Sequence, residues 1–333
     1  MERTNEVTVV CTAYNHEKYI RDALNGFVSQ RTSFPFEVIV HDDASTDQTA
    51  AIIREYEEKY PELIRPIYQI ENQYVKHLGI NRTIISPLVR SKYVAFCEGD
   101  DYWTDPLKLQ KQYDFMEAHP EYTLCTCSTL WMDMKTSQIS SKMVLEEDRD
   151  IPIEEIILET KGRPFQYASF FVRTDIWQQW PTWHKYFPVG DTPLALRAAV
   201  HGKVRMLADV MCVYRYRSTG SWTSRMADAD NKVKQFQKMV EGYSAFEEAS
   251  GGAYHELVSE RIKRLKYHIA VAQGDLKAML TGELRESFAG RSFIQKTNDI
   301  CKCIAPGLYE YLIAVKRTRL YKALKGLKEK QRK

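Results

Sequence analysis

The chain has 333 residues, of which 44% are hydrophobic and 27% are charged, and its formal net charge is +3 at neutral pH. This length and composition allow one large domain or two, and no apolar run approaches the roughly 18 residues needed to span a bilayer. The polar start, MERTNEVTVV, is unlike a secretory signal, and the seven cysteines contain no CxxC pair. We therefore expect a cytoplasmic protein that is soluble or peripheral on the membrane.

Strand-like and helical segments alternate over the first 120 residues. Short apolar runs rich in β-branched residues predict strands, and apolar residues at helical spacing predict helices between them. The strands are expected at 7–12, 36–41, 63–69 and 92–97, and the helices at 17–30, 48–60 and 80–88. Apolar strands without polar alternation are covered on both faces. The alternation therefore predicts an α/β fold with an open, mostly parallel sheet and flanking helices.

The pattern loosens after Pro120 and becomes purely helical near residue 225. Strands are expected at 122–134, 165–172 and 206–217, a short helix at 190–202, and a loop or hairpin at 133–150. From Ala227 onward only helical spacing remains. The sequence thus predicts an α/β domain at 1–225 and a C-terminal α-helical extension at 226–333.

Polar side chains cluster directly after three of the predicted strands. They are Thr12, Tyr14 and Asn15 after the first strand, Asp42 and Asp43 after the second, and Glu98, Asp100 and Asp101 after the fourth. Ligands of open parallel sheets bind beyond the carboxyl ends of the strands, so these side chains mark the expected site. Neither GxGxxG nor GxxxxGK[ST] occurs, which argues against a dinucleotide dehydrogenase and against P-loop chemistry. Turn formation is an alternative role for Asp42 and Asp43.

The three acids in CEGDDYW need a compensating positive charge. Like charges repel one another, and their removal from water is expensive. Carboxylate oxygens are ligands that Mg²⁺ and Mn²⁺ prefer, and Mg²⁺ is usually held by one or two carboxylates together with substrate phosphates. The triplet therefore predicts a metal–diphosphate site that binds Mg²⁺ or Mn²⁺.

Three segments of the chain resemble, in order and spacing, the inverting family 2 glycosyltransferases of the GT-A fold, of the type that builds bacterial polysaccharides. The segments are VTVVCTAYNHEKYIRDALNGFVSQ, FEVIVHDDASTDQT and FCEGDDYWTDPLKLQKQ, and weaker matches continue to about residue 225. The resemblance implies a Rossmann-like sheet and a nucleotide-diphosphate-sugar donor, with a UDP-sugar favoured. It also implies transfer of a hexosyl group, with inversion, to a hydroxyl of a glycan or lipid-linked acceptor in surface polysaccharide synthesis.

The resemblance also assigns roles to the residues after the strands. Thr12, Tyr14 and Asn15 would line the nucleoside pocket, Asp43 or Asp42 would bind the base, Asp100 would approach the ribose, and Asp101 would bind the metal. Glu98 stands where relatives often have Asp and is the second candidate metal ligand. Arg82 or Lys76, in the loop before the fourth strand, is a further candidate donor contact.

A catalytic base is expected later in the chain, because inversion requires a group that deprotonates the acceptor hydroxyl. Asp191, in FPVGDTPLALRAAVHG, precedes Thr192-Pro193 at a predicted helix start and matches a Glu-Asp or Gly-Asp motif of the family. The alternative role for Asp191 is that of a helix N-cap, since Pro is common at helix starts. Both roles are compatible in one residue.

The segment VYRYRSTGSWTS resembles a family segment that often carries a metal-binding His, and here Arg217 takes that place. Arginine does not ligate a cation, but its guanidinium pairs well with phosphate. Trp222 is expected either to close over the donor as part of a lid or to pack in the core.

The last 43 residues, 291–333, carry twelve Lys and Arg against three acids, so they are basic on a mildly acidic chain. They are expected to form either a solvated helix or a helix lying on an anionic membrane surface. No nucleic-acid partner is expected, because no recognition fold accompanies the charge. The sequence leaves open whether the chain forms a homo-oligomer. The alternatives to a glycosyltransferase are a non-catalytic nucleotide-sugar-binding or scaffold protein and, less favoured, a nucleotidyltransferase.

Overall fold

The structure is a computed structural model that describes residues 5–305 apart from 77–78, 161, 220 and 227. The chain divides into two compact units. The first lies in Met1–His184 and Val189–Ser224, and the second in Lys185–Pro188 and Arg225–Lys333. The predicted division into an α/β domain at 1–225 and a helical extension at 226–333 stays a prediction.

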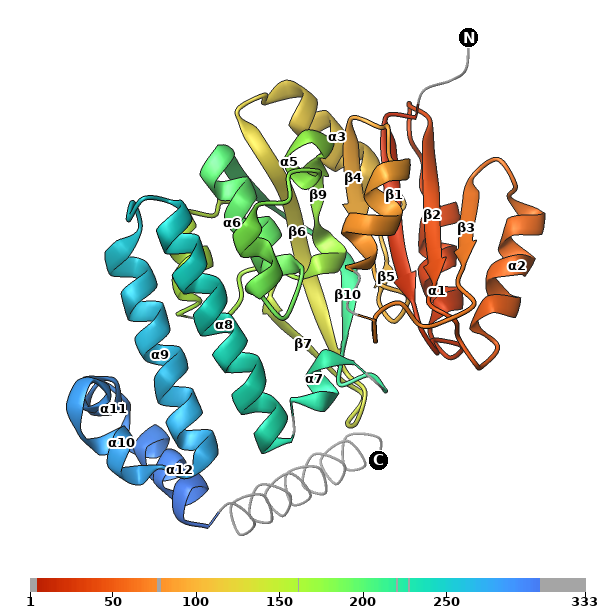
Figure 1. Cartoon of the computed structure of the whole chain (residues 1–333). Helices are drawn as coiled ribbons and strands as arrows, with labels where there is room; N and C mark the ends of the chain where they lie inside the picture. Colours follow the sequence, from red (N-terminus) through yellow and green to blue (C-terminus); the bar gives the residue numbers. More distant parts are fainter. Residues whose placement is uncertain (1–4, 77–78, 161, 220, 227, 306–333) are drawn as a thin grey trace, which may run out of the picture. The chain divides into compact units, whose positions relative to one another are not determined.

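The first unit is built on one mixed sheet (Figure 1). Its strands are β1 Val7–Ala13, β2 Phe36–Asp42, β3 Ile64–Tyr68, β4 Tyr93–Phe96, β5 Tyr102–Trp103, β6 Tyr122–Asp133, β7 Gln138–Met143, β8 Arg149–Asp150, β9 Phe171–Arg173 and β10 Lys203–Tyr216. They follow the order β3-β2-β1-β4-β9-β6-β10-β5, while β7 pairs with β6 and β8 with β10. The predicted open α/β sheet is confirmed.

Parallel pairing is confined to two parts of this sheet. The strands β3, β2, β1 and β4 are parallel neighbours, and β6 is parallel to β10. Between these parts, β9 runs antiparallel to both β4 and β6. The predicted strand at 165–172 is in fact a 3₁₀ turn, η3 Tyr167–Ser169, followed by β9. The buried β1 and β4 carry the continuous apolar runs seen in the sequence.

Helices and short turns connect the strands of the first unit. They are α1 Ile20–Val28, α2 Thr49–Lys59, η1 Asn81–Ile85, η2 Ser86–Leu88, α3 Lys108–Ala118, α4 Ile153–Leu158, α5 Thr174–Trp177, η4 Thr182–Tyr186, α6 Asp191–His201 and α7 Trp222–Arg225. The helix α1 buries Ile20, Leu24 and Phe27 at helical spacing. A Cβ on Gly26 would lie 3.0 Å from the Trp103 carbonyl oxygen, so glycine permits the close approach of α1 to β5.

The second unit is helical. Its elements are α8 Ala229–Ala249, α9 His255–Gln273, α10 Leu276–Leu280, η5 Gly282–Leu284, α11 Arg285–Ala289 and α12 Phe293–Ile304. The long helices α8 and α9 pack side by side (Figure 1). The Tyr267 hydroxyl of α9 donates to Asp299 Oδ2 of α12 at 3.0 Å. Among the described residues, none of the helices has the length and apolarity needed to cross a membrane.

Candidate active site

The loops that follow β1, β2 and β4 are joined by backbone hydrogen bonds. The Asp43 N–H donates to the Ala13 carbonyl at 2.9 Å, and the Gly99 N–H donates to the Thr12 carbonyl at 2.9 Å. In the sheet register, Ala13 lies opposite Asp42. The polar residues that follow these three strands in the sequence therefore lie at one edge of the sheet, as expected for carboxyl ends of parallel strands.

The acidic cluster consists of Glu98, Asp100 and Asp101. One ligand oxygen from each lies within 4.8 Å of the others. Glu98 is exposed, whereas Asp100 is 9% and Asp101 only 1% exposed. Burial raises the pKa of Asp101 well above its usual value, and the charges of Asp100 and Glu98 raise it further. Three hard oxygen ligands with mutually repelling charges fit a divalent cation such as Mg²⁺ or Mn²⁺.

A buried arginine that the sequence analysis missed lies against this cluster. Arg215 of β10 is 5% exposed. Its backbone N–H donates to Asp101 Oδ1 at 2.8 Å, and its Nη1 donates to the Asp100 carbonyl at 2.9 Å. Its Nη2 pairs with Asp22 of α1, and the guanidinium lies 4.4 Å from the centre of the Tyr102 ring. Arg215 thus holds both the backbone and a side chain of the acidic loop.

Strand alternation could have identified this arginine. Arg215 comes two residues after the buried Val213, so both residues point to the same face of β10. In the sequence only Arg217 stands out, because it takes the place of the metal-binding His of the family segment.

The segment after β10 reaches the acidic cluster through Ser218. This buried serine donates its hydroxyl to Asp100 Oδ2 at 2.6 Å. Arg217, the candidate phosphate contact, pairs with Asp133 at the end of β6, and its backbone N–H donates to Thr223 Oγ1 at 3.0 Å. Trp222 begins α7, but its side chain lies outside the described part of the chain.

The residues predicted to line the nucleoside pocket lie at the end of β1 and in the loop after it, and hydrogen bonds join this loop to the one after β2. Asn15 adopts a positive φ of 55°, donates its N–H to Ser45 Oγ at 2.9 Å, and accepts the Thr46 N–H on Oδ1 at 2.8 Å. Thr12 is half-buried and Tyr14 is exposed. The structure thus brings these three residues next to the loop after β2.

The two aspartates after β2 have different surroundings. Asp43 accepts the Gln73 N–H at 2.7 Å and the Tyr74 N–H at 3.0 Å, so it holds the segment after β3. Asp42 Oδ2 accepts the Ser45 N–H at 3.3 Å, a turn contact of the kind the sequence suggested. Its Oδ1 is buried and has no hydrogen-bond partner among the described residues.

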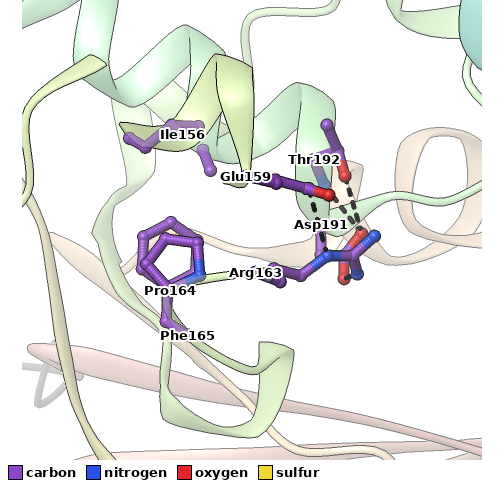
Figure 2. A pocket seen from close by; sticks show the side chains of 8 residues that line it. Ile156, Glu159, Arg163, Pro164, Phe165, Asp191 and Thr192 are labelled. Carbon is purple, nitrogen blue, oxygen red and sulfur yellow. Dashed lines mark hydrogen bonds and ion pairs between the residues drawn. The ribbon is translucent and has the colours of Figure 1, made fainter. Parts of the chain in front are cut away.

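Asp191 is the first residue of α6, and Gly190 rather than Asp191 occupies the N-cap position. Asp191 Oδ1 accepts the Thr192 N–H at 2.7 Å, while Oδ2 pairs with Nη1 of Arg163. Arg163 also forms an ion pair with Glu159, with 3.5 Å between Nε of Arg163 and Oε1 of Glu159 (Figure 2). These three side chains line a small cavity. The ion pair of Arg163 with Asp191 was not predicted from the sequence.

The pKa of Tyr167, which lies in η3, depends on the charges of both Asp191 and the acidic cluster. Burial raises the pKa of the Tyr167 phenol, and the charges of Glu98 and Asp191 raise it further. The Tyr167 hydroxyl accepts a hydrogen bond from Asn81 at 3.2 Å, and the exposed Arg82 is the next residue of η1.

Comparison with known sequences identifies the family. The model of glycosyl transferase family 2 matches residues 8–178. An uncharacterized protein of Mycobacterium tuberculosis is 38% identical over 230 residues, which is 67% of this chain and 62% of that protein, so the chain spans under two thirds of this relative. The Escherichia coli enzyme WfaP, a UDP-Glc:α-D-GlcNAc-diphosphoundecaprenol β-1,3-glucosyltransferase, is 32% identical over 112 residues, or 34% of this chain and 41% of WfaP.

Solved structures show the same fold. Residues 1–349 of Staphylococcus aureus TarS, solved with UDP-GlcNAc, have a TM-score of 0.59 and 19% identity, covering 90% of this chain and 81% of that one. The mannosyltransferase PcManGT of Pyrobaculum calidifontis, solved with GDP-Man and Mn²⁺, has a TM-score of 0.56 and 14% identity, covering 93% and 88%. With its GT-A fold and its matched segment, the chain belongs to glycosyl transferase family 2.

Proposed function

We propose that the chain transfers a hexosyl group, with inversion, from a nucleotide-diphosphate-sugar to a hydroxyl of a glycan or lipid-linked acceptor in surface polysaccharide synthesis. The acidic cluster at the shared edge of β1, β2 and β4 carries this proposal, because it fits a cation bound to a diphosphate. A UDP-sugar is favoured as donor, since WfaP uses UDP-Glc and TarS was solved with UDP-GlcNAc. The lipid-linked acceptor of WfaP suggests work at the cytoplasmic membrane face.

The donor would lie across the joined loops. Thr12, Tyr14 and Asn15 would line the nucleoside pocket. Asp43 would support this pocket by holding the backbone at 73–74, and Asp42 would face the base. Asp100, oriented by Ser218, would approach the ribose. Arg82, Arg217 and Trp222 are further candidate donor contacts.

Two acids of the cluster would hold the cation. Asp101 and Glu98 are the proposed ligands for Mg²⁺ or Mn²⁺, which when bound stabilises the leaving diphosphate as a Lewis acid. Arg215 fixes Asp101 through Oδ1, which leaves Oδ2 for ligation. The buried arginine thereby limits how far the ligand can rotate.

Asp191 is the proposed base. Its carboxylate would accept the proton of the acceptor hydroxyl while that oxygen attacks the anomeric carbon from the side opposite the diphosphate. Its place at the start of α6, in the same compact unit as the acidic cluster, is consistent with an acceptor reaching the donor there.

Measurements of donor turnover and of donor binding distinguish a glycosyltransferase from a nucleotide-sugar-binding protein and from a nucleotidyltransferase. We expect the wild type to release nucleoside diphosphate from one member of a UDP- and GDP-sugar panel with Mn²⁺ and glycan or lipid-linked acceptors. Asp191→Asn should reduce turnover by about 10²- to 10⁴-fold yet keep the rise in Tm caused by UDP and Mn²⁺. Binding without turnover in the wild type would indicate a nucleotide-sugar-binding protein. Pyrophosphate release from a nucleoside triphosphate and a sugar phosphate would indicate a nucleotidyltransferase.

A further inference from the structure

We infer that the outward face of α12, in the second unit, is a membrane-binding surface whose apolar side chains enter the headgroup region of an anionic bilayer. The helix packs on α9 and α10 of the same unit (Figure 1). Three of its large apolar side chains face solvent, because Phe293 is 83%, Ile294 71% and Ile304 67% exposed. The inference goes beyond the proposed transfer reaction and does not depend on it.

The exposed apolar side chains of α12 form one continuous stripe. With about 3.6 residues per turn, Phe293, Ile294 and Ile304 lie within about 100° of arc around the helix axis. The same arc contains the exposed Thr297 and the half-buried Cys301. The Thr297 hydroxyl donates to the Phe293 carbonyl at 3.0 Å, so its hydrogen bond is made within the helix. These residues are called the α12 stripe below.

The opposite side of α12 is the side that packs. Ile300 and Cys303 contact the apolar core of the second unit. Asp299, the one acid of α12, is 3% exposed and pairs with Arg291 at 2.6 Å and with Lys302 at 3.7 Å. The α12 stripe is therefore a second apolar face, which the packing of the described residues leaves in contact with solvent.

Positive charge borders the α12 stripe on both sides. In helical projection, Lys296 lies about 60° outside one edge of the stripe and Lys302 about 80° outside the other. An apolar centre with lysines at its edges suits the surface of a bilayer, because the long side chains reach lipid phosphates while the apolar groups enter the acyl boundary. Residues 306–333 add nine Lys and Arg against two Glu in the sequence, so an anionic surface is favoured.

A lipid surface fits the α12 stripe better than a second protein. A helix of 12 residues is about 18 Å long and about 10 Å wide, so one face offers on the order of 200 Å². A stable protein interface buries about 800 Å² on each partner. Insertion into lipid has no such minimum, since each apolar side chain removed from water contributes by its own area.

Binding of the full chain to vesicles of phosphatidylglycerol and phosphatidylcholine tests the inference. We expect Phe293→Ser combined with Ile294→Ser to lower the partition coefficient by about 10-fold or more, because two large apolar side chains no longer enter the lipid. Lys296→Gln should lower it by up to about 5-fold. The matched control is Ile139→Ser, which removes a side chain that is 60% exposed on β7 of the first unit and should bind like the wild type.

The depth of the α12 stripe in the bilayer gives a second, direct measurement. In the vesicle-bound state, Phe293→Trp should be quenched by bromine-labelled acyl chains more strongly than the wild type, whose six Trp residues set the background. This measurement also decides the question if the double Ser variant does not fold.

Unchanged vesicle binding of the folded double Ser variant, or no additional quenching in Phe293→Trp, would overturn the inference. A markedly lower Tm of the double Ser variant without vesicles would show that the chain itself covers the α12 stripe. A lipid-free oligomer that this variant loses would show that a second copy covers it, and either result would overturn the inference. Vesicle binding needs no turnover, so failure of the proposed transfer reaction is scored separately.

Discussion

Burial of Asp101 and the negative charges of its neighbours both raise its pKa, so both favour its protonated form. A carboxyl whose folded-state pKa is raised binds more protons folded than unfolded, so ionisation lowers stability as the pH rises above its unfolded value of about 3.9. When a chelator removes divalent metal ions, we expect the free energy of unfolding of Asp101→Asn to be larger than that of the wild type. The difference should grow as the pH rises above about 4. Urea denaturation at a series of pH values measures this difference.

Asparagine keeps an oxygen that can accept the Arg215 N–H, so the substitution removes mainly the charge. Mn²⁺ should reverse the order, raising the Tm of the wild type and not that of Asp101→Asn. Glu98→Gln is the control, since Glu98 is exposed and its substitution should change the metal-free stability less. A metal-free Asp101→Asn protein less stable than the wild type at pH 7 would contradict this account.

Substitution of Arg215 tests how much its buried hydrogen bonds stabilise the protein. Arg215→Met should lower the free energy of unfolding by about 2 to 3 kcal/mol, because it removes hydrogen bonds to Asp22 and to the Asp100 carbonyl from a buried position. It should also weaken the Mn²⁺-induced rise in Tm, since Asp101 and Asp100 lose the group that holds their loop.

The control for Arg215 is Arg21→Met, which breaks an exposed pair with Glu55. Its urea midpoint should stay close to that of the wild type. Equal losses of stability in the two variants would show that Arg215 is no more than a surface ion pair, and an unchanged response to Mn²⁺ would separate it from the acidic cluster.

At the scale of elements, α6 carries Asp191 and is bounded by two glycines in different surroundings. A Cβ on Gly202, which ends α6, would lie 2.6 Å from Thr123 Cγ2 and 2.8 Å from the Glu121 carbonyl oxygen. Gly202→Ala should therefore destabilise the protein by about 1 to 3 kcal/mol through overpacking against β6. Gly190→Ala, with nothing within 4 Å of its Cβ, is the matched control and should be nearly neutral. Chemical denaturation that gives equal effects would contradict the close packing of α6.

The elements also show what local sequence could and could not predict. The strands β1, β2 and β4 and the acids after them follow from continuous apolar runs and from the rule that sites lie at carboxyl ends. These features depend on neighbours within a few residues, which a sequence pattern records.

The partners of the site residues depend instead on the order of strands. Arg215 meets Asp101 across 114 positions of chain, and Arg217 meets Asp133 across 84. Both contacts arise because β10 is parallel to β6 and antiparallel to β5, pairings that periodicity does not indicate. The ion pair of Arg163 with Asp191 is likewise set by the packing of α4 against α6.

At the scale of the whole molecule, charge is divided unevenly along the chain. Residues 306–333, which lie outside the described residues, contain nine Lys and Arg and two Glu among residues such as Leu308, Leu312 and Leu320. Mixed apolar and basic residues favour a surface that is both hydrophobic and anionic, and each Lys or Arg near such a membrane contributes about 1 kcal/mol. A lipid-linked acceptor would place the enzyme at that surface.

We therefore expect the full chain to sediment with vesicles that contain anionic lipid and to be released as the salt concentration rises, because the Debye length falls to about 3 Å at 1 M. A chain shortened after Ala305 should lose most of this binding but keep the rise in Tm caused by UDP and Mn²⁺. Neutral vesicles are the control for purely apolar insertion, since they should bind both forms weakly. Equal sedimentation of the full and shortened chains with anionic vesicles would place the membrane contact elsewhere, and salt-insensitive binding would show that charge does not drive it.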